Sequence, residues 1–246
     1  MKSLVVSDLH FEFHRDGGLS MVDSLSDADV CLFPGDLSNA AGIWDGLLLM
    51  LRKYAHVVFV FGNHEFYGSS IHVVRRKIQG LQRRLSALPG TYGQLHVLDN
   101  STCELNGRRF VGTTLWFRDD PGNAAASPEL NDFYQIKNAW RSISRENAEA
   151  LQFLEETVTT GDIVLTHHLP AEDSVHPQWK GNNLNRFFLC DVGPLIQERQ
   201  PSLWLHGHTH VTRAYHLGQT EVLCNPFGYA ARDENPEFNP RLLVEV

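Results

Sequence analysis

The amino-acid sequence predicts an α/β fold, and two observations support this prediction. Short apolar runs rich in Val, Leu and Phe recur along the chain, and stretches with helical spacing separate them. Polar residues follow these runs directly, such as Asp8 after Leu4–Val6 and Asp36 after Asp29–Phe33. Because open α/β sheets bind ligands at the carboxyl ends of their strands, the pattern predicts a site at one edge of a sheet.

The N-terminal part of the chain predicts strands that alternate with helices. One of these helices carries basic residues at helical spacing (Arg75, Arg76, Lys77, Arg83 and Arg84), which is more typical of a solvated helix face than of a nucleic-acid patch. The predicted strands are Leu4–Val6, Asp29–Phe33, Val57–Phe61 and His96–Leu98, and the predicted helices are Trp44–Tyr54 and Ser70–Leu85.

The rest of the chain continues this rhythm and then becomes strand-rich. The turn-forming segment Arg118–Asn123 and the polar residues up to Glu129 predict a loop near the site. Ser144 is a candidate N-cap for a helix that reaches Thr157. The remaining predicted elements are strands Arg109–Trp116 and Asp162–Thr166, a loop and helix within Asn183–Arg199, and an antiparallel tail formed by Arg213–Leu217, Glu221–Leu223 and Leu242–Val246.

Composition restricts the classes of partner. The chain has 246 residues, of which 42% are hydrophobic and 20% charged, so we expect residues 1–246 to form a single domain with a proper core. A net charge of −8 argues against broad binding to nucleic acid or to an anionic membrane. It still permits a small phosphate ester, whose charge bound cations would neutralise.

The N-terminus and the cysteines indicate the cellular compartment of the protein. The predicted strand near Met1 leads directly into Asp8 and His10, so a cleavable signal peptide would remove candidate ligands. No apolar run approaches membrane-spanning length. The four cysteines are far apart and form no Cys-x-x-Cys motif. These features predict a cytoplasmic protein without disulfides.

Histidines and carboxylates are concentrated after the predicted strands. His206, His208 and His210 follow the run Ser202–Leu205, and Gly207 allows alternate side chains to face different ions. A lone histidine is more often a core or surface residue, but these have companions at other strand ends. The full set is Asp8, His10, Asp36, Asn63, His64, His167 or His168, His208 and His210.

These donors indicate a particular chemistry. Imidazole and carboxylate ligands without sulfur suit Mn, Fe or Zn better than Ca or Mg, and a carboxylate can bridge two cations. Two cations held close together polarise an ester oxygen and lower the pKa of a shared water molecule. The set therefore predicts phosphoester hydrolysis.

Five segments resemble, in chain order, the signature blocks of the calcineurin-like metallophosphoesterase superfamily. The combination is far more specific than any single block. The resemblance reaches from near the start to about residue 210, and it implies a layered α-β-β-α sandwich with mixed sheets and a metal site at the C-terminal ends of the strands. The blocks are Asp8-x-His10, Gly35-Asp36, Gly62-Asn63-His64-Glu65, His167 and Gly207-His208-x-His210.

The resemblance also implies a set of ligands for two divalent or trivalent ions, of Mn, Fe or Zn. Asp8, His10 and His210 would bind the first ion together with Asp36, which would bridge to the second.

The second ion would be bound by Asn63, His208 and the histidine that follows the predicted strand Asp162–Thr166. Family placement favours His167, the first residue after this strand, over His168. His168 would then be a pocket residue or a structural residue.

His64 and Asn39 are the candidate catalytic residues. In the family, the histidine at the position of His64 protonates the leaving group or hydrogen-bonds the phosphate oxygens, and an aspartate three residues after the bridging aspartate often orients it. Here Asn39 occupies that position. An amide can orient the ring but cannot stabilise its positive charge, so phosphate binding is expected of His64 while a general-acid role stays open.

Three further segments resemble a bacterial branch of the superfamily whose substrates are mostly unassigned. Aromatic residues after strands are more often core residues, so one or two of a larger set are candidates for walls of a substrate pocket: Phe66, Tyr67, Trp116, Trp179, Phe227 and Tyr229. Arg118, Arg186 and Arg213 are candidates for phosphate clamps, although surface placement is the more common outcome for each. The three segments are Gly112–Trp116, Asn131–Phe133 and Asn225–Tyr229.

The motifs together predict a two-metal hydrolase in which a metal-bridging hydroxide attacks phosphorus in line, without a covalent enzyme intermediate. Phosphomonoesters and phosphodiesters both remain open as substrates, and a small-molecule ester is favoured. The alternative is a catalytically weak scaffold of the same fold that binds metal or a partner. A nuclease would need a basic track, which the acidic composition does not provide.

Overall fold

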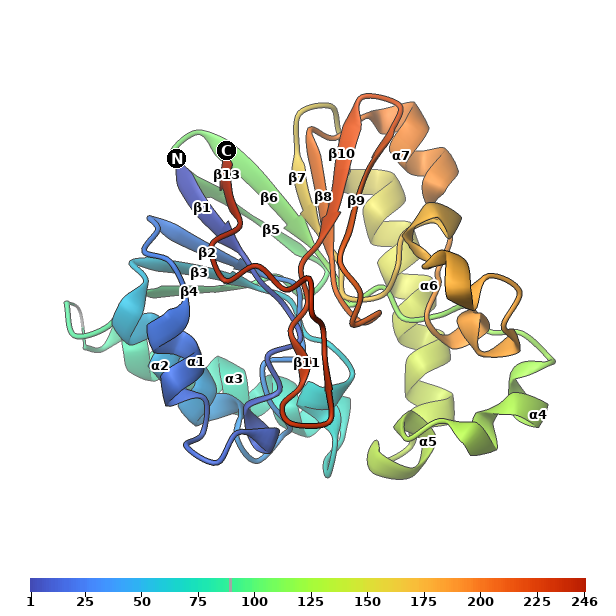
Figure 1. Ribbon diagram of the computed structural model, residues 1–246, viewed down its shortest axis with the longest axis horizontal. Coiled ribbons are helices and arrows are strands. Elements are labelled where there is room, and N and C mark those ends of the chain that lie inside the picture. The colour runs from blue at the N-terminus through green and yellow to red at the C-terminus, as the bar shows by residue number, and fades with distance from the viewer. Residues whose placement is uncertain (89) are drawn as a thin grey trace.

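Two β-sheets pack face to face in the computed structural model, which describes residues 1–88 and 90–246 (Figure 1). The first sheet has the order β13-β1-β2-β3-β4, and the second has the order β5-β6-β7-β8-β10-β9. A short pair, β11 (Gly228–Tyr229) and β12 (Asp233–Glu234), stands apart. The strands of the first sheet are β1 (Lys2–Val5), β2 (Val30–Phe33), β3 (His56–Phe59), β4 (Gln94–Val97) and β13 (Leu243–Glu245), and those of the second are β5 (Ser101–Leu105), β6 (Arg108–Gly112), β7 (Ile163–Leu165), β8 (Leu203–His206), β9 (Arg213–Leu217) and β10 (Thr220–Cys224).

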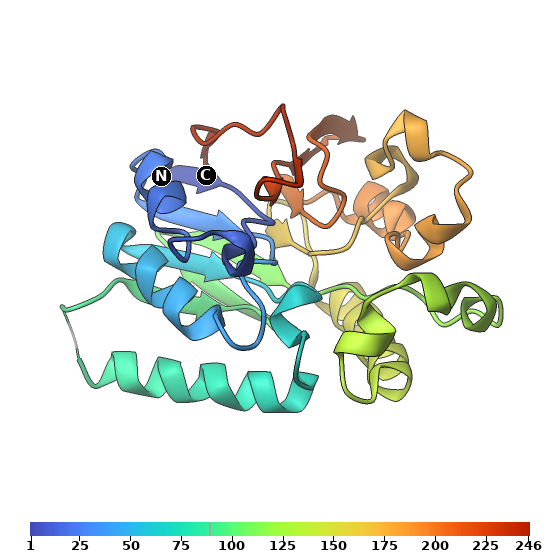
Figure 2. The same cartoon turned by 60° about the horizontal axis from the view of Figure 1, so that its bottom comes forward.

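Helices cover the outer face of each sheet (Figure 2). This arrangement confirms the predicted α/β fold with four α-β-β-α layers and mixed sheets. Helices α1 (Leu19–Ser24), α2 (Ile43–Lys53) and α3 (Ile71–Ser86) lie on the first sheet, α6 (Ala139–Thr157) and α7 (Gly193–Arg199) lie on the second, and the short helices α4 (Asn123–Ala126) and α5 (Asp132–Gln135) precede α6. Within the described residues, no helix combines the length and apolarity needed to cross a bilayer.

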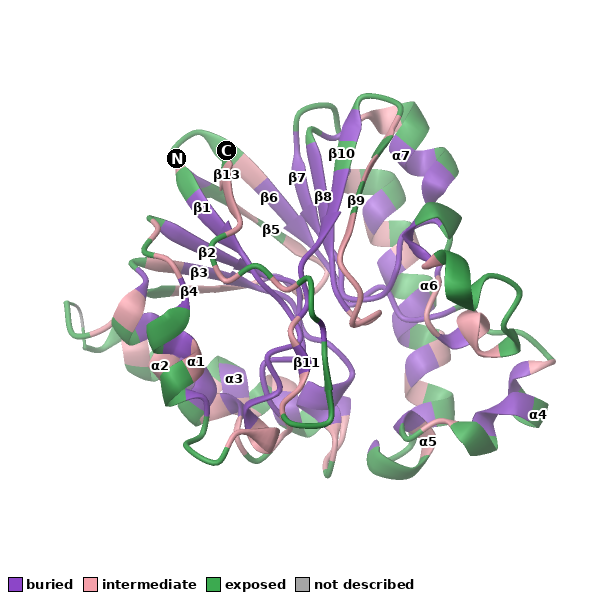
Figure 3. Cartoon of the chain, in the orientation of Figure 1, coloured by how far each residue is buried: buried purple, intermediate pink, exposed green. Residues whose placement is uncertain are grey.

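Burial explains why the strands are apolar along their whole length. Val30–Phe33 and Leu203–His206 are buried at every position, because one face packs on helices and the other on the opposite sheet (Figure 3). Leu32, Val58 and Phe110 belong to the apolar cluster between the sheets. Each remaining sheet face packs on its own helices in a further cluster.

The directions of the strands bring the carboxyl ends of the strands of both sheets to one edge. Strands β1 to β4 are mutually parallel, as are β6, β7, β8 and β10. The loops that leave β1 and β10 also meet, because Ser7 and Pro226 form an isolated parallel bridge. The carboxyl ends of the central strands therefore share one edge, as the sequence predicted.

Several elements differ from the sequence predictions. Helix α6 begins at Ala139, and the hydroxyl of Ser144 donates to Asp119 rather than capping the helix. The segment predicted as a loop up to Glu129 contains α4 and a 3-10 helix. The last predicted strand leaves the antiparallel pair β9–β10 and joins β1 in the first sheet as β13. These outcomes depend on contacts between residues far apart in sequence.

An ion pair joins the helix layer of one sheet to that of the other. Arg75 on α3 donates to the Glu146 carboxylate on α6 at 2.9 and 2.5 Å, and it also donates to Asp99 at 2.7 Å. The Glu146 side chain is only 3% exposed. Burial raises the pKa of Glu146, but the hydrogen bond and charge of Arg75 outweigh burial and lower this pKa below its ordinary value of 4.5.

We predict that Glu146→Gln lowers the free energy of unfolding by about 1–3 kcal/mol near neutral pH, because it leaves Arg75 only partly neutralised. A lowered folded-state pKa means that ionised Glu146 contributes stability above pH 4.5, and that this contribution is lost as the pH falls further. Urea unfolding at several pH values should show the wild type and the variant converging in acid. The exposed Glu149→Gln is the control, and a difference independent of pH would contradict the prediction.

Candidate metal centre

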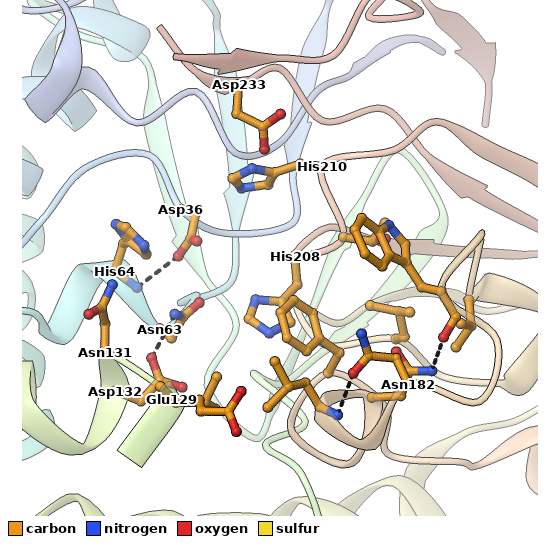
Figure 4. A pocket seen from close by; sticks show the side chains of 18 of the residues that line it. Asp36, Asn63, His64, Glu129, Asn131, Asp132, Asn182, His208, His210 and Asp233 are labelled. Atoms are coloured by element: carbon orange, nitrogen blue, oxygen red, sulfur yellow. Dashed lines mark hydrogen bonds between the residues drawn. The ribbon is translucent and has the colours of Figure 1, made fainter. Parts of the chain in front are cut away.

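The loops after five parallel strands bring the predicted metal ligands together. Figure 4 shows four of these ligands, Asp36, Asn63, His208 and His210. Three groups have donor atoms that lie within 4.8 Å of one another, and Asp36 and His10 each belong to two of them. Asn63 joins the set because its Oδ1 lies 3.0 Å from His167 Nε2. The three groups are Asp8, His10 and His210; His10, Asp36 and His64; and Asp36, His167 and His208.

Most of these residues have a strained backbone. Asp8, His10, Asp36, His208 and His210 all have positive φ, between 46° and 70°. A left-handed conformation costs a residue with a Cβ roughly 1–2 kcal/mol, and such residues are concentrated at functional sites. In the loops after β1 and β8 this conformation occurs at alternate residues, and the donor atoms of these residues belong to the three donor groups.

Three glycines allow the loops to approach this closely. A Cβ added at Gly62 would collide with the Asp36 carboxylate, and one at Gly207 would lie 2.5 Å from Asp8 Oδ2. A Cβ at Gly35 would lie 2.6 Å from Nδ1 of His167. The glycines of the signature blocks are therefore required by packing around the donors.

The donors at the His167 end fit a cation. His167 Nδ1 lies 2.8 Å from the Pro34 carbonyl, which can only accept, so Nδ1 carries a proton. In a neutral ring, Nε2 then presents its lone pair to Asp36 Oδ2 at 3.4 Å and Asn63 Oδ1 at 3.0 Å. Burial lowers the pKa of His167, but the charge of Asp36 overrides it and raises this pKa to about 10. A cation would satisfy these three facing acceptors in place of the added proton.

The other end has the same character. His10 Nε2 lies 3.1 Å from His210 Nε2 and 3.6 Å from Asp36 Oδ2. His210 Nε2 is also 3.6 Å from Asp8 Oδ1. All of these side chains except that of His210 are fully buried or nearly so. A cluster of carboxylates and imidazoles removed from water is the donor set that Mn, Fe or Zn prefers.

His168 lies beside the donors but belongs to none of their groups, and its ring lies 4.3 Å from that of His208 between centroids. Its Nδ1 lies 3.3 Å from the Thr114 carbonyl, its ring packs against Trp116 at a centroid distance of 5.0 Å, and its Nε2 has no partner among the described residues. Burial lowers the pKa of His168 to about 3, so the ring is neutral. The structure thus brings His167, and not His168, to Asp36.

The structure corrects the expected partner of His64. Its Nδ1 lies 2.8 Å from Glu12 Oε1 and its Nε2 lies 3.1 Å from the Tyr229 hydroxyl, so neither ring nitrogen is left for Asn39. The Asn39 side chain instead accepts from the backbone N–H groups of Ala41 and Gly42, both at 3.1 Å, just before α2. The pairing of Asn39 with His64 was wrong, and Glu12 takes that place.

Glu12 connects His64 to the metal donors. Besides His64, its Oε1 lies 3.4 Å from Nδ1 of His10. Burial raises the pKa of Glu12, but the hydrogen bonds with His10 and His64 outweigh burial and lower this pKa to about 2. Sequence reasoning missed Glu12, and its position two residues after His10 was the only available signal.

Asp132 orients the predicted ligand Asn63. Its Oδ1 accepts from Asn63 Nδ2 at 2.8 Å and from the Tyr67 hydroxyl at 2.6 Å. Because a carboxylate accepts only, it fixes the amide nitrogen on its own side and turns Asn63 Oδ1 toward His167. Asp132 lies in α5, within a segment that the sequence singled out without assigning a role.

Glu65 fixes the backbone of two donor loops. Its buried carboxylate accepts from the N–H groups of Gly62 at 2.5 Å, Asp36 at 2.9 Å, Leu37 at 2.7 Å and Ser38 at 3.3 Å. It therefore connects the loop after β2 to the loop after β3. The sequence marked Glu65 as part of a signature block but did not indicate this role.

Comparison with protein families identifies the pattern. The family model described as calcineurin-like phosphoesterase matches residues 1–212. The uncharacterized protein L509 of Acanthamoeba polyphaga mimivirus is 25% identical over 272 residues, a match that covers 98% of this chain and 95% of that protein.

Solved structures share the fold. The phosphopantetheinyl hydrolase of Mycobacterium tuberculosis superimposes with a TM-score of 0.67 at 16% identity, covering 93% of this chain and 89% of that one. The TT1561 protein of Thermus thermophilus has a TM-score of 0.54 at 14% identity, covering 92% and 88%. At these identities the likeness is one of fold.

We predict that Glu65→Gln lowers the free energy of unfolding by about 2–4 kcal/mol, because the amide supplies one acceptor oxygen and places an NH₂ group against backbone N–H donors. Thermal and urea unfolding measure this effect. Glu172→Gln, which changes an exposed carboxylate, serves as the control. Equal stability of the two variants would show that the Glu65 contacts are dispensable.

Proposed function

We propose that this chain, which belongs to the calcineurin-like phosphoesterase family, hydrolyses small-molecule phosphate esters with two bound metal ions. Family membership establishes metal-dependent phosphoester hydrolysis in general. The observation that supports two ions is the sharing of donors, since Asp36 lies in one group with His167 and His208 and in another with His10. A shared carboxylate is the arrangement expected of a bridging ligand.

The ligands we propose are the seven that the sequence indicated, with Asp36 between the two ions. Nitrogen and oxygen donors without sulfur favour Mn, Fe or Zn. When bound, such ions would polarise the phosphate and supply hydroxide near neutral pH. The proposed ligands are Asp8, His10 and His210 for one ion, Asn63, His167 and His208 for the other, and Asp36 for both.

The protein side chains then have distinct tasks. His64 lies beside Asp36 and lines the same cavity as His208 and His210. Its Nε2 would hydrogen-bond a phosphate oxygen or the leaving-group oxygen in place of the Tyr229 hydroxyl that it contacts without substrate. Glu12 and Tyr229 hold the ring from its two nitrogens. Asp132 keeps the Asn63 oxygen turned toward the donors. The mechanism we propose is in-line attack on phosphorus without a covalent enzyme intermediate, with hydroxide that the bound ions would supply.

The alternative function is a scaffold of the same fold that binds metal or a partner and hydrolyses poorly. Such a protein would be expected to lack ligands, whereas all seven positions here converge. We also propose that residues 1–246 form one domain and that nucleic acid is not the substrate, given the net charge of −8.

Metal removal tests the proposed function. Purified protein is expected to bind about two Mn²⁺ per chain and to hydrolyse aryl phosphomonoesters or diesters, and Asp36→Ala or His208→Ala should lower kcat at least about a hundredfold. Metal analysis and turnover before and after chelation give the readouts. His216→Ala, an exposed histidine on β9, is the control. Full turnover after chelation would refute the proposal, and absence of both metal and turnover would favour the scaffold.

A second prediction concerns His64. Glu12→Gln should lower kcat about 10–100-fold with little change in KM, because the ring loses the carboxylate that orients it. Metal content measured on the same sample separates this effect from ligand loss. The matched control is Asn39→Asp, which keeps the oxygen that accepts from Gly42 and should leave kcat unchanged. A larger effect at Asn39 than at Glu12 would restore the partner indicated by the sequence.

A further inference from the structure

The cavity next to the metal donors has two chemically different sides. It has a volume of about 360 Å³, and Asp36, Asn63 and His208 line one side of it. The segment from Leu169 to Phe188 forms the opposite side (Figure 4). A phosphate placed at the donors would therefore direct its ester group toward this segment.

The far side of the cavity is largely apolar. Leu169 and Val175 are buried in its wall, and the ring of Phe188 lies 4.5 Å from that of His208, between centroids. Trp179 continues the apolar surface outward and is 47% exposed. Apolar surface thus begins at the donors and extends to solvent, and an exposed tryptophan next to a site is typical of a ligand contact.

Internal hydrogen bonds hold this wall in place. The Asn182 side chain accepts from the N–H group of Leu184 at 2.9 Å. The Asn185 amide donates to the carbonyl of Trp179 at 2.7 Å. The wall is therefore formed before a ligand binds, which reduces the entropy lost on binding.

Charge on the cavity surface is negative. No Lys or Arg is among its lining residues in the described chain, whereas the exposed carboxylates Glu129 and Asp233 line it. A second anionic group on the substrate would meet these carboxylates without a lysine or arginine to pair with, and it would be repelled.

The arginines that the sequence indicated as phosphate clamps are engaged elsewhere. Arg118 donates to the Asp191 carbonyl at 3.0 Å, and Arg213 donates to the Asp173 carbonyl at 2.7 Å. Arg186 pairs with Asp120 at 3.4 Å. None of the three lines the cavity. They are therefore not placed to neutralise an anionic ester group.

We infer that the wall formed by Leu169, Val175, Trp179, Leu184 and Phe188 is the subsite for the ester group of the substrate, and that this group is apolar and either uncharged or cationic rather than anionic. The inference rests on the proposed function, because it takes the phosphate to bind at the metal donors. It excludes substrates with a second phosphate or a carboxylate in this position.

A series of p-nitrophenyl phosphodiesters tests the charge preference with the Mn²⁺-loaded protein. The second ester group is 3,3-dimethylbutyl (uncharged), choline (its cationic isostere) or 3-carboxypropyl (anionic), and methyl p-nitrophenyl phosphate is the small reference. In each reaction, water oxygen bonds to phosphorus, the bond to p-nitrophenolate breaks, and the proton of the water passes to solvent. We expect kcat/KM for the first two esters to exceed that for the carboxylate by about tenfold or more.

Two kinds of variant separate the contribution of the apolar wall from that of the acidic rim, which consists of Glu129 and Asp233. Trp179→Ala should lower kcat/KM for the dimethylbutyl ester about five- to tenfold while leaving the methyl ester unchanged, and Trp179→Phe should restore most of it. Trp44→Ala, on α2 outside the cavity, is the matched control. The double variant Glu129→Gln, Asp233→Asn should narrow the gap between the choline and carboxylate esters, and added salt should do the same.

The outcomes distinguish this inference from the proposed function. Hydrolysis of none of the four esters, the methyl ester included, would refute the proposed function itself. Hydrolysis of all four with equal kcat/KM, or preference for the carboxylate, would refute the subsite while leaving the hydrolase intact. If Trp179→Ala lowers kcat/KM for the methyl ester as much as for the dimethylbutyl ester, the subsite would also be refuted, because the loss of activity would not depend on the ester group.

Discussion

The candidate metal centre depends on the hydrogen bonds that the Glu65 carboxylate accepts from the backbone. It accepts from backbone N–H groups in the loops after β2 and β3, and the same loops carry Asp36 and Asn63. The Asp36 carboxylate in turn accepts from the backbone N–H of His64 at 2.9 Å. Because one buried carboxyl group fixes the position of both backbones, the donor side chains start from a rigid base.

The same arrangement places two buried carboxylates close together, and a bound cation would reduce their mutual repulsion. Asp8 and Asp36 are both fully buried side chains with acidic groups close together, and burial with the charge of Asp36 raises the pKa of Asp8. The neighbouring imidazoles at His208 and His210 have pKa values lowered by burial, so they are neutral donors. Without a cation, a proton on His167 offsets part of the carboxylate charge in this dry site, and a bound metal ion would take the place of that proton.

The substrate side of the site uses the opposite chemistry. Buried polar groups lie at the sheet edge, and the segment up to Phe188 adds an apolar wall with acidic residues at its rim. In the function that we propose, residues at the sheet edge bind the phosphate, and loops bind the ester group. Loops that vary on a fixed scaffold are where proteins of one fold differ in specificity.

The sequence by itself determined the layers of the fold and indicated the candidate metal donors. Apolar runs indicate strands, and the Asp, Asn and His residues that follow them indicate the carboxyl ends of these strands. Both patterns are local, so they can be recognised without the tertiary structure. The family of the chain followed from the same residues in order. Local sequence does not distinguish a structural histidine from a candidate donor, as His206 shows. Nothing in the local pattern separates His206 from His208, yet His206 is buried and its Nε2 lies 2.9 Å from the Ser174 hydroxyl.

Tertiary structure alone decided which side chains support the donors. Asn39 has the right sequence position to orient His64, but its oxygen accepts from the turn before α2, and Glu12 reaches the ring from another loop. Asp132 reaches Asn63 across 69 residues of chain, and Asp99 and Glu146 meet at Arg75 in the same way. Such contacts depend on how distant segments pack, and packing geometry leaves no periodic or local pattern in the sequence from which it could be inferred.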